Sequence, residues 1–120
     1  MECIEIYSGL DGHSAFRTIH AFEASPVIFK GVAVSLSSPQ PCESVLVHEF
    51  DADYVLGWHN PPARQYVIVL DGELEITVQG SDTAQRFAAG AMFIAGDMDS
   101  TGHTTRAIRS GRALVVNVRV

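Results

Sequence analysis

The sequence predicts an all-β domain, an antiparallel double-sheet barrel or sandwich, because three of its features are typical of short strands packed face to face. Hydrophobic residues alternate with polar ones at a period of two, so that Leu74, Ile76 and Val78 fall on one face of the segment 73–79. Turn-forming residues separate the apolar segments at short intervals. No long segment has the 3.6-residue period of a helix. This combination is typical of antiparallel barrels and sandwiches.

The predicted strands follow one another along the whole chain. The opening segment, residues 1–24, is the least regular, and its stretch 16–22 fits either a short helix or an edge strand. Residues 27–36 fit one long strand or two shorter ones, with Gly31 as a bulge. The remaining predicted strands are 44–50, 65–70, 73–79, 84–87, 91–95, 103–108 and 113–120, the last with alternating Leu114, Val116, Val118 and Val120.

Asp71-Gly72 is the strongest hairpin signal in the chain. It stands directly between the predicted strands 65–70 and 73–79. A tight two-residue turn needs a positive φ, which glycine adopts at little cost. We therefore expect these two strands to be hairpin neighbours. Further turn signals lie at 37–41, 80–82, 89–90 and 110–111.

Length and composition predict a single domain over residues 1–120, without a nucleic-acid or membrane partner. The formal net charge is −6, and Lys30 is the only lysine. Nucleic acids and anionic membranes both need clustered positive charge. The apolar runs are too short to span a bilayer. The first residues lack the basic and apolar regions of a secretory signal, so we expect a cytoplasmic protein. Cys3 and Cys42 are then expected to be free thiols.

Two histidines and a glutamine are the candidate functional residues. His59 stands six residues before Gln65, and His103 lies in a later predicted strand. If these strands fold over one another, the three side chains can point into one cavity and hold a divalent metal. Imidazole nitrogen suits zinc, iron and nickel, whereas an amide oxygen is a harder and weaker donor. Three neutral ligands would leave the full charge on the ion and favour direct binding of an anionic substrate.

A fourth donor would complete the usual coordination shell. His48, on the predicted strand 44–50, is one candidate, and Asp97 or Asp99 in the loop before His103 are others. Water could also fill this position, as it does in open catalytic sites. For Asp97 a structural role is the favoured alternative, in which its carboxylate caps backbone amides of the loop.

The segment 58–72 resembles the first motif of the cupin superfamily of small β-barrels. That motif has two histidines one residue apart, then a glutamate, then a glycine seven residues later. His59 matches the first histidine and Gly72 the glycine, whereas Pro61 replaces the second histidine and Gln65 the glutamate. The resemblance implies a metal site near these positions, and the two replacements make that site degenerate.

The second cupin motif is matched in part by residues 90–107. Gly90 opens it and His103 matches its histidine after a longer loop than usual, while Ala107 stands where the motif has an asparagine. The resemblance covers roughly residues 42–108. Within the superfamily, these residues resemble a subgroup of small bacterial cupins with no general assigned reaction. This resemblance implies a conserved-barrel fold, frequent homodimers and a pocket inside the barrel mouth. For the dimer we expect an edge or face that includes the N-terminal segment.

The sequence leaves three functions open for a small-molecule-binding barrel with a degenerate site for zinc, iron, nickel or manganese. The first is metal-dependent dioxygenation. The second is metal-free isomerisation or epimerisation of a small acid or sugar, with His59 or His103 as the general base. The third is a non-catalytic sensor that holds a metabolite. In each case the predicted substrate pocket includes Trp58, Arg64, Val67 and Thr105.

Two of these pocket residues have alternative roles. Trp58 could pack at the barrel wall instead of forming a substrate platform. Arg64 could bind a carboxylate through both of its terminal nitrogens, or it could be solvated or paired across a dimer. Val67 and Thr105 are assigned to the pocket by parity, because they share strand faces with Gln65 and His103.

Overall fold

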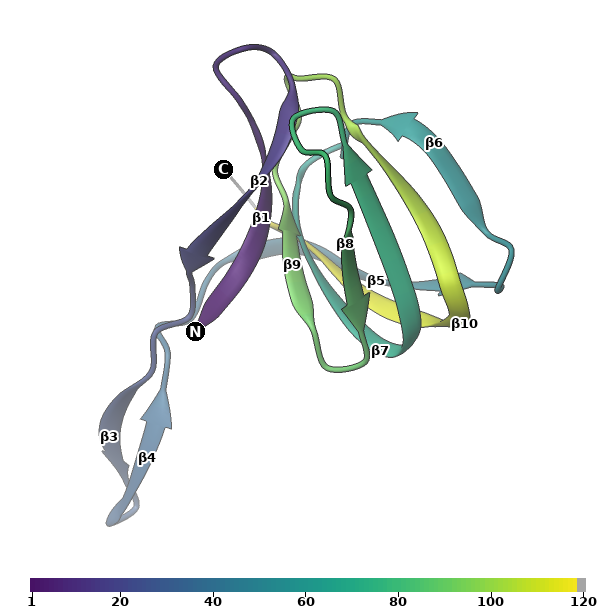
Figure 1. The fold of residues 1–120 in the computed structure, drawn as a ribbon. Helices are drawn as coiled ribbons and strands as arrows, with labels where there is room; N and C mark the ends of the chain where they lie inside the picture. The colour runs from purple at the N-terminus through teal and green to yellow at the C-terminus, as the bar shows by residue number, and fades with distance from the viewer. Residues whose placement is uncertain (119–120) are drawn as a thin grey trace.

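The computed structural model describes residues 1–118, and every regular element in this range is a β-strand (Figure 1). The all-β prediction is confirmed. Val120, the last residue of the predicted strand 113–120, lies outside the described residues. The strands are β1 (Glu2–Ser8), β2 (Ser14–His20), β3 (Ser25–Phe29), β4 (Val32–Leu36), β5 (Cys42–Phe50), β6 (Val55–His59), β7 (Arg64–Val78), β8 (Gln85–Ala88), β9 (Met92–Ala95) and β10 (His103–Val118).

Eight of the strands form one sheet that bends into two layers. Strands β7 and β10 are 15 and 16 residues long and pair with each other along their length. The first part of β7 and the last part of β10 belong to the large layer, in the order β2-β1-β9-β7-β10-β5. The last part of β7 and the first part of β10 belong to the small layer, flanked by β8 and β6. The sheet does not close into a complete barrel, because β2 and β5 end the order.

The predicted hairpin at Asp71-Gly72 is wrong, because β7 runs through this position without turning back. Gly72 has a φ of 78°, and the pairing of β7 with β10 shifts register opposite it, around Gly111. A Cβ atom on Gly72 would lie 2.5 Å from the carbonyl oxygen of Ser110. The glycines therefore let both long strands bend closely together where they pass from one layer to the other. The predicted turn at 110–111 lies within β10 for the same reason.

The two uncertain segments near the N-terminus are strands. The stretch 16–22 falls mostly within β2, an edge strand paired with β1. Residues 27–36 form two strands, because Lys30 and Gly31 adopt φ values of 50° and 77° and close a two-residue turn between β3 and β4. This hairpin forms a separate two-stranded sheet and projects from the two-layered body (Figure 1), which makes the molecule 50 Å long.

The core lies between the two layers. It includes Ile6, Val69, Leu74, Ile76 and Phe93, so the predicted alternation at 73–79 does place one apolar face inside. A second, smaller cluster lies on the outer face of the large layer and contains Cys3, Tyr66, Ile94 and Val118. Cys3 and Cys42 are both free thiols. No helix within residues 1–118 is long and apolar enough to cross a membrane.

Candidate functional site

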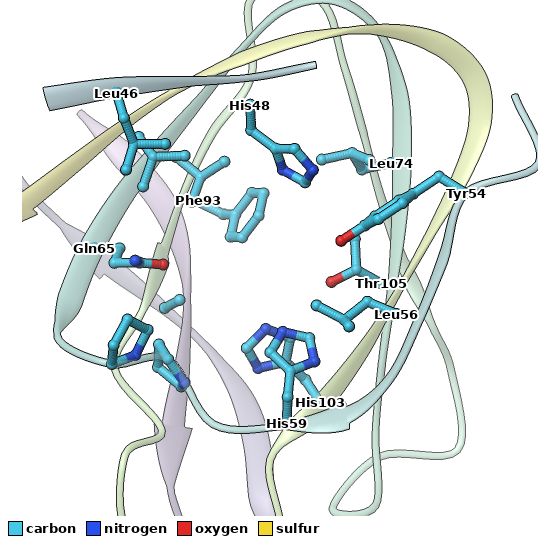
Figure 2. A pocket seen from close by; sticks show the side chains of 15 residues that line it. Leu46, His48, Tyr54, Leu56, His59, Gln65, Leu74, Phe93, His103 and Thr105 are labelled. Atoms are coloured by element: carbon cyan, nitrogen blue, oxygen red, sulfur yellow. The ribbon is translucent and has the colours of Figure 1, made fainter. Parts of the chain in front are cut away.

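A cavity of about 240 Å³ opens between the two layers (Figure 2). Its walls are mainly apolar, and several polar side chains reach into it. The lining residues are Leu46, His48, Tyr54, Leu56, His59, Pro61, Pro62, Gln65, Val67, Leu74, Phe93, Ala95, His103, Thr105 and Val115. All three predicted donors and His48 therefore lie around the same cavity, although their relative positions differ from the prediction.

His59 and His103 lie together at one side of this cavity. β6 pairs with the start of β10 so that His59 stands directly opposite His103. The ring centroids are 4.3 Å apart and the ring planes are inclined by 60°. Gly102 allows this approach, because a Cβ atom there would overlap the backbone carbonyl of His59. Two histidines that are distant in the sequence thus form one pair in the cavity wall.

Asp97 fixes the orientation of His103. Its carboxylate is fully buried, and its oxygens lie 2.9 and 3.1 Å from Nδ1 of His103. Ser14 Oγ donates to the same carboxylate at 2.7 Å and accepts from the backbone amide of Gly102 at 2.9 Å. Because an ionised carboxylate can only accept, Nδ1 of His103 carries the proton and Nε2 is the nitrogen left for a ligand.

His59 is oriented in a similar way by its own strand. Its Nδ1 lies 2.7 Å from the backbone carbonyl of Gly57, which can only accept, so this nitrogen also donates. Burial lowers the pKa of His59 below the usual histidine value, and the neighbouring His103 lowers it further. His59 is therefore neutral near pH 7, with its Nε2 lone pair available.

Gln65 faces the histidines from across the cavity instead of lying beside them (Figure 2). Its Nε2 donates to Oδ1 of Asn117 at 2.9 Å, and Asn117 in turn donates to Ser44. The alternation of side chains along β7 correctly predicted that Gln65 faces the cavity. It could not indicate how far apart Gln65 and His59 would lie, because two prolines and a bend separate them.

His48, the predicted fourth donor, belongs to another part of the wall. Its ring packs edge-on against Phe50 and Tyr54, with centroid distances of 5.7 and 5.1 Å. Burial raises the pKa of Tyr54, so this phenol stays protonated and can donate into the cavity. Within residues 1–118, no three side chains of histidine, cysteine, aspartate or glutamate come close enough together to hold a metal ion.

The four predicted pocket residues divide into two groups. Val67 and Thr105 line the cavity, whereas Trp58 and Arg64 do not. Trp58 is half exposed, because it lies next to His59 on the opposite face of β6. Arg64 forms an ion pair with the buried carboxylate of Glu5 at 2.6 Å, so its guanidinium neutralises a charge within the large layer and does not face the cavity.

Sequence reasoning missed several important residues of the site. Asp97 was considered as a loop cap or a metal donor, not as the partner of His103. The apolar lining residues Leu46, Leu56 and Phe93 and the hydroxyl of Tyr54 were not predicted either. The apolar segments in β5, β6 and β9 could have indicated Leu46, Leu56 and Phe93, but only once those strands had been placed beside the histidines.

Comparison with known proteins gives a structural likeness without a function. No protein-family model matches the chain, and no curated protein matches it. The chain is similar to the crystal structure of a conserved protein of unknown function from Streptococcus pyogenes, with 25% sequence identity and a TM-score of 0.54. The match covers 71% of this chain and 70% of the other. The likeness extends over most of both chains and assigns no activity.

Proposed function

We propose that this chain is a cytoplasmic small-molecule-binding protein with a cupin-type β-sandwich, and that His59 and His103 contact the ligand in its cavity. Two observations support the fold assignment: a two-layered sheet that is antiparallel except for the parallel pair β1–β9, and the partial cupin motifs around His59 and His103. The observation that carries the function is the array Asp97–His103–His59 in the wall of an apolar cavity. Orienting hydrogen bonds on both Nδ1 atoms leave two imidazole Nε2 atoms for one bound molecule.

The cavity selects a small ligand with an apolar part and polar groups at two ends. Its volume of about 240 Å³ is below the range of about 300–1,000 Å³ that is typical of pockets for drug-sized molecules. One polar end would meet the imidazoles, and the other would meet the carboxamide of Gln65 across the cavity. Thr105 and Tyr54 supply hydroxyl groups from the wall opposite Gln65 (Figure 2). A small acid or sugar derivative meets these requirements.

The catalytic form of this proposal is metal-free isomerisation or epimerisation. A neutral imidazole removes a proton from a carbon next to a carbonyl, and the electrons of the C–H bond pass into the enolate. The imidazolium then returns the proton to another carbon or to the other face of the same carbon, so no oxidant or reductant is needed. The buried Asp97 carboxylate stabilises the positive charge on His103 during this transfer.

A divalent metal is the second candidate, and one observation favours it. A carboxylate or carbonyl on Nδ1 is the usual arrangement for a histidine that binds metal through Nε2, and both His59 and His103 have it. The donor set fits a resident metal only in part, since catalytic sites usually have three protein ligands. Gln65 faces the pair from across the cavity, so we assign no reaction step to a metal.

Two measurements test the proposal. The first is a thermal-shift screen of the parent protein against small acids and sugars, repeated with His59→Gln and His103→Gln. We expect compounds that raise the melting temperature of the parent but not of either variant. His20→Gln is the matched control, because His20 is an exposed histidine on β2 away from the cavity, and it should respond like the parent. Compounds that stabilise all four proteins equally would contradict the proposed site.

The second measurement separates the candidate functions. Turnover of a stabilising compound in the presence of a chelator supports metal-free catalysis, and binding without turnover supports the sensor alternative. Metal analysis of the purified protein tests the metal candidate. Stoichiometric metal that is lost from both histidine variants would support that candidate and replace the metal-free reaction.

A further inference from the structure

The hairpin β3–β4 has one face that is apolar except for Ser25, and no element within residues 1–118 covers it. Its cross-strand pairs place Val27 opposite Val34 and Phe29 opposite Val32, and Leu36 continues the same face. Phe29, Val32 and Leu36 are 62%, 60% and 55% exposed. An isolated two-stranded hairpin is only marginally stable in water, so this element needs a surface to pack on.

The outer face of the large layer has matching apolar character. The register aligns Val47, Leu114, Ile68 and Met92 in one row across β5, β10, β7 and β9. Val45 and Val116 begin the adjacent row, which continues to the buried Tyr66. The part of this face on β5 is the least covered, since Val45 is 55% and Val47 53% exposed. We call this surface the outer face.

The hairpin of the same chain does not cover the outer face. It projects away from the body (Figure 1), and its apolar residues are all exposed or half-buried. Six large apolar side chains of the two surfaces are each at least 43% exposed: Val27, Phe29, Val32, Leu36, Val45 and Val47. Exposed apolar patches of this kind mark interaction surfaces in soluble proteins.

We propose that two copies of this chain form a symmetric dimer by exchanging hairpins, with the apolar face of each β3–β4 hairpin packed on the outer face of the other copy. Both surfaces are present in every chain, so a twofold-symmetric pair covers both surfaces of both copies. No further copy can then add, and the assembly stops at two chains. The charges agree with this arrangement. Lys30, the only lysine, lies at the hairpin tip, and the exposed carboxylate of Glu49 lies beyond Val47 on the same face of β5. This inference does not depend on the proposed function.

The test is the mass of the full-length protein in solution, measured by light scattering and sedimentation. We expect the parent to have twice the chain mass of 13.0 kDa at micromolar concentration. Phe29→Asp on the hairpin and Val47→Asp on the outer face should each weaken the dimer at least 100-fold. Leu10→Asp is the control, because Leu10 is fully exposed in the turn between β1 and β2 and should leave the dimer intact. Circular dichroism shows whether each variant keeps its β-structure.

Mixing the two disrupting variants distinguishes exchange from other dimers. A mixture of Phe29→Asp and Val47→Asp chains can form one intact contact, between the hairpin of the second variant and the outer face of the first. We therefore expect more dimer in the mixture than in either variant alone. A monomeric parent, or a folded Phe29→Asp variant that stays dimeric, would overturn the proposal. So would a Val47→Asp variant that dimerises like the parent, since the hairpins would then pack on each other.

Discussion

His59 and His103 face each other across adjacent strands, with ring centroids 4.3 Å apart. Each Nδ1 has an acceptor, the carbonyl of Gly57 for His59 and the carboxylate of Asp97 for His103. The pair therefore has fixed ring orientations before any ligand arrives. Such preorganisation is what a binding or proton-transfer site requires, because it avoids the entropic cost of ordering side chains when the ligand binds.

Asp97→Asn should impair both stability and ligand binding. The carboxylate accepts hydrogen bonds from His103 and Ser14, and an amide in its place would turn a donor toward one of them. We expect a loss of about 2 kcal/mol in the free energy of unfolding, as for other buried groups left without a partner. Urea denaturation measures this, with the exposed Asp99→Asn as control. Equal stabilities of the two variants would contradict the role given to Asp97.

His59 should make the stability of the protein fall as the pH falls. Burial lowers its pKa in the folded state, so the unfolded chain takes up the proton first, below a pH of about 6.5. The free energy of unfolding therefore decreases from that pH down to the folded-state pKa. His59→Gln removes this contribution, so its stability should decrease less than that of the parent between pH 8 and pH 5. Parallel pH profiles from urea denaturation would show that His59 is not desolvated.

Gly72→Ala should strongly destabilise the corner where β7 and β10 change layers. The new Cβ would lie 2.5 Å from the carbonyl of Ser110, and the residue would keep a positive φ. We expect a loss of about 3 kcal/mol, since backbone strain and overpacking each cost about 1–3 kcal/mol. Gly57→Ala is the matched control, because a Cβ there meets open space on β6. Similar melting temperatures for the two variants would argue against a bend that requires glycine.

Arg64→Leu should affect stability without affecting ligand binding. Arg64 and Arg17 both bind the carboxylate of Glu5, which is only 3% exposed. Removing Arg64 from this buried carboxylate should lower the free energy of unfolding by about 2 kcal/mol. The loss is limited to this size because Arg17 still pairs with Glu5. Compounds that stabilise the parent should bind the variant with unchanged affinity in calorimetry. A large loss of affinity would instead place Arg64 in the ligand site.

The sequence predicted the all-β class of the fold and the shared cavity of His59 and His103. It predicted less well how the strands are connected to one another. Alternating residues such as Leu74 and Ile76 indicated which faces are buried, because strand periodicity is a local property. The role of Gly72 was misjudged, since a positive φ serves a bend in a long strand as well as a hairpin turn. The pairing of Asp97 with His103 depends on how a loop folds back beside β2, which local patterns do not encode.

The most direct test of the account is a long-range ¹H–¹⁵N NMR spectrum of the two imidazoles, recorded with and without a compound from the thermal-shift screen. His59→Gln and His103→Gln assign the signals. We predict that both neutral rings carry the proton on Nδ1, and that the Nε2 signals of both shift together on addition of the compound. Protonation of His103 at Nε2 in the neutral ring, or Nε2 signals that do not move at saturating compound, would contradict the central claim.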